Sequence, residues 1–169
     1  MTPFYTSKKN LLRLFLFMGS TFTWGQTQQI HYWNFNALPS GTLTSVAPDA
    51  SLLPTGTQIT YPGTGAGYMD NVAGSALNAQ NGDAAGLGLR PRNPSNTRAL
   101  LVSAPTTGYQ NIIIKFATTR TTQGASSQNY SYTLNGTDFI TTGLAITTYS
   151  PQTEPTYEVV TLDFSEDAK

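Results

Sequence analysis

The chain has 169 residues, of which nine are basic, nine are acidic, one is histidine and none is cysteine. This length allows one domain, and the absence of cysteine excludes disulfides and a lipoprotein attachment site. Charged residues make up only 11% of the chain, a composition that suits short strands and polar turns better than surface helices.

Residues 1–25 have the pattern of a signal peptide. The pattern consists of a positive leader, a short apolar run and small residues before a cut, formed by Lys8, Lys9 and Arg13, then Leu14 to Phe22, then Thr23 and Gly25. The apolar run is about half of the roughly 20 residues that span a bilayer. We therefore expect cleavage before Gln26 and export of residues 26–169, with a transmembrane anchor as the alternative.

Loss of this leader changes the charge balance. Three of the nine basic residues lie in it, so its removal leaves six basic against nine acidic residues, a net charge of about −3. A faintly acidic surface argues against nucleic acid as a partner. It argues equally against binding to an anionic membrane face.

Helical periodicity is absent after residue 26, and strand-like runs recur between Gly, Pro, Asn and Ser. The expected strands are, in chain order, Ile30 to Phe35, Thr55 to Tyr61, Gly86 to Arg90, Arg98 to Ser103, Asn111 to Thr118, Gln128 to Leu134, Asp138 to Thr141 and Tyr157 to Phe164. Residues 65–74 are rich in glycine, and we expect a loop there around a short extended piece at Tyr68 and Met69. About eight short strands with frequent turns predict an all-β, jelly-roll-like sandwich of antiparallel strands.

The run from Asn111 to Thr118 is the most apolar of these strands. Its two faces carry Ile112, Ile114 and Phe116 on one side, and Ile113, Lys115 and Ala117 on the other. A strand that is apolar on nearly both faces is expected at the centre of a sheet.

Three further residue patterns predict local structure. Asn135-Gly136 indicates a hairpin with a type I′ turn, which needs positive φ at both central residues. Pro91 places its strand at a sheet edge, because proline lacks an N–H group. In the last strand, Leu162 and Phe164 are expected to face the core, with Asp163 between them facing out.

Several long strings of this sequence resemble a module found at the N-terminal end of secreted, multidomain Bacteroidota proteins of the type IX secretion cargo kind. The strings are IHYWNFNALPSGTLTSVAPD, ITYPGTGAGYMD, LNAQNGDAAGLGLRPRNPSNTRALLVSAPTTGY, IIIKFATTRTTQGA and YEVVTLDF. The resemblance covers Ile30 to Phe164. It implies a jelly-roll sandwich on a cell-surface or extracellular protein, with downstream domains such as a hydrolase, a nuclease or a lamin-tail-like domain, and it implies no activity of the module itself.

The end of the chain departs from that pattern. The members continue into a charged linker, another strand and a closing strand, whereas this chain stops at Lys169. We therefore expect a truncated gene or a fragment that lacks its last strands. Such a sandwich would have unpaired backbone and exposed apolar side chains along one flank.

Catalysis is not expected from these residues. His31 is the only candidate base for a serine-type triad, and it is expected on a strand face shared with Trp33 and Phe35, which favours a structural role. One histidine and no cysteine cannot supply a histidine-based zinc site. A glycosidase carboxylate pair drawn from the aspartates remains as an alternative; these are Asp70, Asp83, Asp138 and Asp163.

Calcium is the one metal that the residues suggest, and no other cofactor is expected. Asp70-Asn71 and Asn81-Gly82-Asp83 place hard oxygen ligands in two predicted loops, and calcium prefers such ligands. The alternative is that Asn-Gly-Asp is an ordinary turn, because Asn and Gly tolerate left-handed backbone. The candidate metal ligands are Asp70 and Asp83.

A candidate ligand site combines arginines and aromatic rings. Arg90 and Arg92 are expected on one strand face, and together with Trp33, Tyr68 or Tyr109 they would bind a glycan through hydrogen bonds and ring stacking. The alternative is that the arginine side chains tie a proline-rich loop to carbonyls and carboxylates.

The leading interpretation is a secreted or cell-surface, non-catalytic binding or adhesion module of a larger protein, with a glycan or cell-surface polysaccharide as partner. The second is a purely structural accessory domain for a neighbouring enzyme. The third is a weak glycoside hydrolase. An exposed aromatic platform favours the first, aromatic rings all buried in the core favour the second, and the third requires two converging carboxylates.

Overall fold

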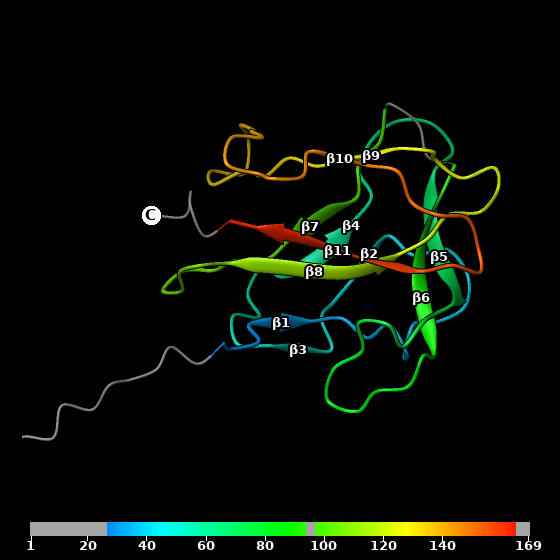
Figure 1. Cartoon of the computed structure of the whole chain (residues 1–169), viewed down its shortest axis with the longest axis horizontal. Coiled ribbons are helices and arrows are strands. Elements are labelled where there is room, and N and C mark those ends of the chain that lie inside the picture. The colour runs from blue at the N-terminus through cyan, green and yellow to red at the C-terminus, as the bar shows by residue number, and fades with distance from the viewer. Residues whose placement is uncertain (1–26, 94–96, 165–169) are drawn as a thin grey trace, which may run out of the picture.

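The structure is a computed structural model that describes residues 27–93 and 97–164, and within these ranges it contains eleven strands and no helix (Figure 1). In chain order the strands are β1 (His31–Tyr32), β2 (Ser45–Val46), β3 (Ala50–Ser51), β4 (Gln58–Thr60), β5 (Tyr68–Ala73), β6 (Leu87–Arg92), β7 (Leu101–Ser103), β8 (Ile113–Thr118), β9 (Gln128–Asn129), β10 (Thr148–Tyr149) and β11 (Glu158–Asp163). The all-β prediction is confirmed. Most strands have only two or three residues, so the chain forms more and shorter strands than expected.

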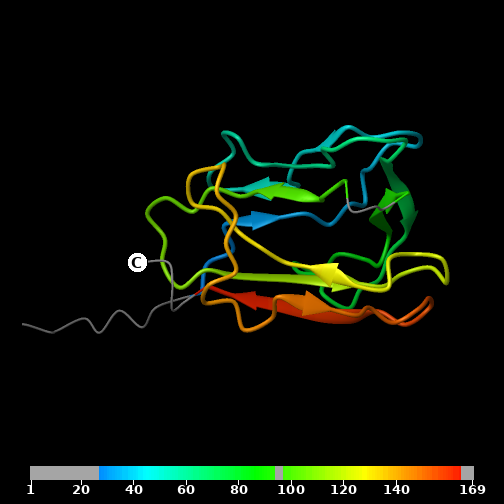
Figure 2. The same cartoon turned by 90° about the horizontal axis from the view of Figure 1, so that it is seen from above.

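All strand pairs are antiparallel. One sheet has three strands in the order β2-β4-β7, and the other strands form the pairs β1-β3, β5-β6, β8-β11 and β9-β10. Figure 2 shows the β8-β11 pair and the β2-β4-β7 sheet in two separate layers, while β5 and β6 run across one end of both. This is a sandwich, and the β5-β6 ribbon closes one end of it.

The main core lies where the ribbon meets the three-stranded sheet. Val46 of β2, Ile59 of β4 and Met69 of β5 are buried, and Met69 is fully so. Partly buried side chains surround them, namely Trp33, Phe35, Leu38, Leu43, Tyr61 and Leu89. The ribbon is therefore fixed to the sandwich by the side chains of its inner face.

A second apolar group belongs to the β8-β11 layer. Val160 is 2% exposed and Phe164 is 9% exposed, and the Phe164 ring meets the edge of the Tyr132 ring at 5.2 Å. Leu162 is half-buried while Asp163 is exposed. The expected inward alternation of the last strand is confirmed.

The first strand is shorter than predicted because the backbone turns at Phe35. Phe35 has a φ of 62°, which is incompatible with an extended strand. The carboxylate of Asp49 accepts hydrogen bonds from the N–H groups of Asn34 (2.7 Å) and Phe35 (3.3 Å) and holds this turn. The extended run consequently ends after His31 and Tyr32.

Two predictions about strands were wrong. Residues 68–73 form a full six-residue strand rather than a loop, because pairing with β6 supplies the backbone hydrogen bonds that the sequence of this segment does not reveal. The apolar strand β8 is not central, since among the described residues it pairs only with β11. Its outer face is exposed, with Ile113 at 49%.

The Asn-Gly hairpin forms, but with a different turn. The N–H and C=O groups of Tyr132 and Ile140 bond reciprocally at 2.8 and 2.9 Å, which confirms the hairpin. Of the two turn residues only Gly136 has a positive φ (81°), so the type I′ prediction was wrong. The Asn135 side-chain oxygen accepts the N–H groups of Thr137 and Asp138 instead, and this local bonding supports a longer loop.

Two earlier predictions concern residues outside the described ranges: the signal peptide was predicted over residues 1–25, and the expected missing strands would follow residues 165–169. Within the described ranges, no helix has the length and apolar character that a membrane span requires.

Candidate functional site

The outer face of the β5-β6 ribbon gathers four of the predicted site residues. The register pairs Tyr68 with Arg92 and Asp70 with Arg90. Because alternate strand residues point to opposite faces, these four side chains share one face, opposite to buried Met69. We call the group Tyr68, Asp70, Arg90 and Arg92 the ribbon cluster.

Asp70 is the centre of the ribbon cluster. Its Oδ1 accepts a hydrogen bond from Arg90 Nε at 2.9 Å, and its Oδ2 accepts from Arg90 Nη2 at 3.1 Å and from Arg92 Nε at 2.9 Å. The paired Arg90 fork is the strong, bidentate geometry for a carboxylate. One carboxylate thereby fixes two half-buried guanidinium groups on the outer face of the ribbon.

The three charged side chains of the ribbon cluster differ in how far they are exposed to solvent. The Asp70 side chain is 16% exposed, that of Arg90 is 26% and that of Arg92 is 39%. The hydrogen bonds from Arg90, followed by the one from Arg92, hold the pKa of Asp70 below its ordinary value of 3.8. Asp70 is therefore ionised at neutral pH, and the pair of arginines carries one more positive charge than Asp70 neutralises.

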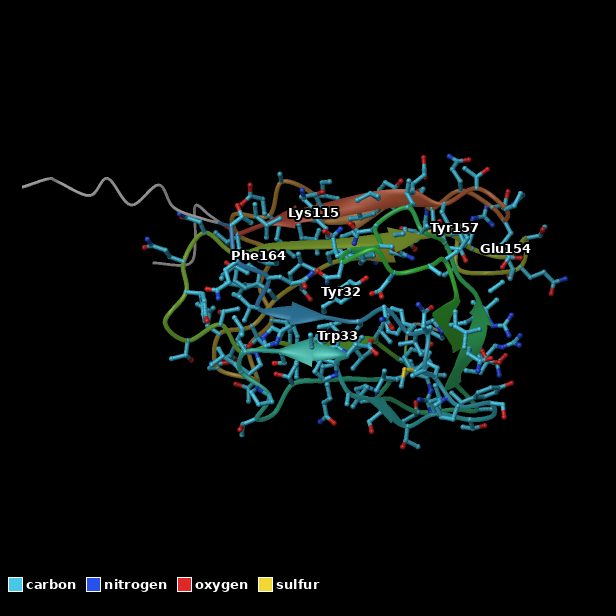
Figure 3. All side chains as sticks on the ribbon, turned by 90° about the horizontal axis from the view of Figure 1, so that it is seen from below. Tyr32, Trp33, Lys115, Glu154, Tyr157 and Phe164 are labelled. Atoms are coloured by element: carbon cyan, nitrogen blue, oxygen red, sulfur yellow. The ribbon has the colours of Figure 1, made fainter. Side chains whose placement is uncertain are left out.

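Two residues from the segment before β11 extend this surface. Figure 3 shows Glu154 and Tyr157 at the end of the molecule that carries β5 and β6. The Tyr157 hydroxyl donates a 2.8 Å hydrogen bond to the carbonyl of Ala73, the last residue of β5. Burial and, second, the charge of Glu154 raise the pKa of Tyr157, so its hydroxyl keeps its proton. Sequence reasoning missed both residues, since they are more than 60 positions away from the ribbon and no local pattern links them to it.

The other two predicted ligand residues lie elsewhere. Trp33 packs against the main core, and its ring nitrogen donates to the carbonyl of Val46 at 3.4 Å. Tyr109 ends a turn in which its N–H bonds the carbonyl of Thr106. Among the described residues, neither has a hydrogen bond or ring contact to the ribbon cluster. The structure thus brings together Tyr68, Arg90 and Arg92 but separates them from Trp33 and Tyr109.

The two predicted calcium ligands have other partners. Both oxygens of Asp70 accept hydrogen bonds from arginines, and Asp83 Oδ2 accepts one from the side chain of Asn34 at 3.0 Å. No group of three or more metal-ligating side chains occurs in the described part of the chain. Calcium at Asp70 would therefore have to displace arginine, and calcium binding stays a prediction.

His31 is held by two hydrogen bonds. Its Nε2 lies 2.7 Å from the carbonyl oxygen of Pro105, which can only accept, so Nε2 carries the proton. In the neutral ring Nδ1 then accepts from the hydroxyl of Ser51, its partner across the β1-β3 pair, at 2.8 Å. The Ser51 oxygen also accepts the N–H of Leu53. This arrangement joins three chain segments through the side chain of His31.

The remaining predicted carboxylates are engaged or apart. Asp138 Oδ2 accepts a hydrogen bond from Asn135 within its own loop, and Asp163 lies on the exposed face of β11. The described part of the chain also has small concave regions, one of them of about 220 Å³ and bordered by Phe35, Leu38, Leu43, Val46 and Asp49. Asp49 is the only acidic residue on that border.

Comparison with known proteins adds no assignment, because no family model, no curated protein and no solved structure matches this chain.

Proposed function

We propose that the chain is a non-catalytic, extracellular carbohydrate-binding module of a larger secreted or surface protein, with the ribbon cluster as its binding site. The observation that carries this proposal is the outer face of the β5-β6 ribbon, which Tyr68, Arg90 and Arg92 share as half-buried residues. Fixed guanidinium groups supply directional hydrogen bonds to sugar hydroxyls, and an adjacent tyrosine ring offers a flat apolar surface for a sugar ring.

The organisation of the ribbon supports this proposal. Asp70 orients both arginines before any ligand arrives, so little side-chain freedom is lost on binding. Met69 and Leu89, on the inner face, anchor the same two strands in the core. A site built on a paired and anchored ribbon is positioned more accurately than one on a free loop.

Affinity electrophoresis of the full chain against a panel of polysaccharides tests the proposal. At least one polysaccharide should retard the protein, and Arg92→Ala and Tyr68→Ala should each remove most of that retardation. Lys115→Ala removes an exposed cation from β8, outside the β5-β6 ribbon. This variant should leave the retardation unchanged. Tyr109→Ala is the matched tyrosine control. Loss of binding in Tyr109→Ala but not in Tyr68→Ala would refute this assignment of the site.

A structural accessory module for a neighbouring enzyme is the second candidate. The observation that favours it is the outward face of the β8-β11 pair, where Ile113 is 49% and Val159 is 41% exposed. Apolar side chains on a sheet face suit packing against another domain. Uniform absence of retardation across the panel would favour this candidate.

A further inference from the structure

The two arginines of the ribbon cluster differ in which of their N–H donors are bonded to Asp70. Arg90 spends Nε and one Nη on Asp70, whereas Arg92 donates to Asp70 through Nε alone. No described residue accepts a hydrogen bond from either Nη atom of Arg92. Among the described residues, the two Nη groups at the tip of Arg92 therefore form an unoccupied pair of donors.

This unoccupied pair belongs to Arg92, whose side chain is 39% exposed, more than that of Asp70 or Arg90. A guanidinium group with two parallel free N–H donors matches the two oxygens of a planar carboxylate. Asp70 cannot supply that second contact, because its oxygens are already shared by three N–H donors.

The local charge of the ribbon cluster also favours a ligand that carries a carboxylate. Two arginines share one aspartate, and Glu154 acts on Arg90, which leaves Arg92 as the less compensated of the two. The chain without its leader has a net charge of about −3, so the overall field repels polyanions. An acidic polymer that binds must therefore do so through a local site.

Building on the proposed function, we propose that the ribbon cluster selects glycans that carry carboxylates, with the Nη pair of Arg92 binding the carboxylate of a uronic acid and Tyr68 packing against the sugar ring. Tyr68 is the direct cross-strand partner of Arg92. Such partners lie about 5 Å apart at Cβ, so one sugar unit can contact both.

The test compares two polymers that differ only at the carboxylate. Affinity electrophoresis of the full chain is run in gels that contain polygalacturonate or the same polymer after complete methyl esterification. We expect retardation by polygalacturonate with an apparent affinity at least about tenfold higher than for the ester, since esterification removes a charge-assisted contact. Equal retardation by both polymers, or stronger retardation by dextran sulfate, would overturn the carboxylate assignment.

Variants separate the geometry of Arg92 from its charge. Arg92→Lys keeps the charge but lacks the planar pair of donors, so the affinity for polygalacturonate should fall about fivefold or more, and Arg92→Gln should abolish retardation. Lys115→Gln should have no effect. Each variant is first checked for an unchanged melting temperature. Binding to neutral polysaccharides alone would overturn this inference and leave the proposed function standing, whereas no retardation by any polymer would remove both.

Discussion

Shortening Val160 to alanine tests which face of β11 carries the core. Val160 is 2% exposed, and its neighbour Val159 on the same strand is 41% exposed. Both residues are valines in one strand, so replacing either by alanine changes the intrinsic β propensity by the same amount. The pair Val160→Ala and Val159→Ala therefore isolates the effect of burial.

The expected magnitude follows from the exposed fractions. Valine to alanine removes the equivalent of two methylene groups, worth about 1.6 kcal/mol when fully buried. At Val160 the rigid surroundings add a cavity term, so the free energy of unfolding should fall by about 2 to 3 kcal/mol. At Val159 roughly half of the surface is already in water, and the loss should stay below about 1 kcal/mol.

Urea unfolding of the full chain, followed by tryptophan fluorescence, measures both values. The midpoint should move much further for Val160→Ala while the slope stays constant, which marks a change in stability rather than in compactness. Equal losses, or a larger loss for Val159→Ala, would refute the assigned register. A slip of one residue exchanges the two faces of a strand, so the experiment reports on register directly.

Further predictions concern acid stability, close backbone packing, export and calcium. Because arginine hydrogen bonds hold the pKa of Asp70 below 3.8, its stabilisation is complete above that pH and is lost as the pH falls below it; Asp70→Asn should flatten this acid decline in melting temperature. A Cβ on Gly74 would lie within 2.6 Å of backbone atoms, whereas one on Gly88 meets ordinary contacts of 3.6 Å or more; Gly74→Ala should thus lose about 1 to 3 kcal/mol by urea unfolding and Gly88→Ala less than about 0.5. Mass spectrometry of exported protein should find Gln26 at or near the N-terminus. If calcium binds at Asp70 and Asp83, it should raise the melting temperature and Asp83→Ala should abolish that rise, whereas no calcium-dependent shift in the unsubstituted chain would leave the turn interpretation.

The fold class was predictable because it depends on composition and on local alternation. Leu162 and Phe164 alternate with Asp163, and in the structure Phe164 is buried, Leu162 is half-buried and Asp163 is exposed. The pairing of strands was less predictable. The apolar character of β8 indicated a central position, yet Ile113 faces outward, because strand order depends on contacts between distant segments that no local pattern encodes.

The candidate site was predictable in its residue types but not in its assembly. Arg90 and Arg92 stand two positions apart, so a shared face follows from strand periodicity alone. Their position beside Tyr68 and Asp70 depends on the β5-β6 register. That register was not predicted, because the glycines around β5 indicated a loop instead of a strand. Asp70 was assigned to a metal because its arginine partners, 20 and 22 residues later, are not evident from its own surroundings.

The β5-β6 ribbon has a consequence for how this sequence can change over time. Along β5 and β6, positions that fill the core, such as Met69 and Leu89, alternate with positions that meet the ligand in our proposal, such as Tyr68 and Arg90. Substitution at the second set leaves the first set in place. Selection can therefore diversify what the module recognises at every other residue while purifying selection preserves the residues between, so homologues should vary along this ribbon with a period of two.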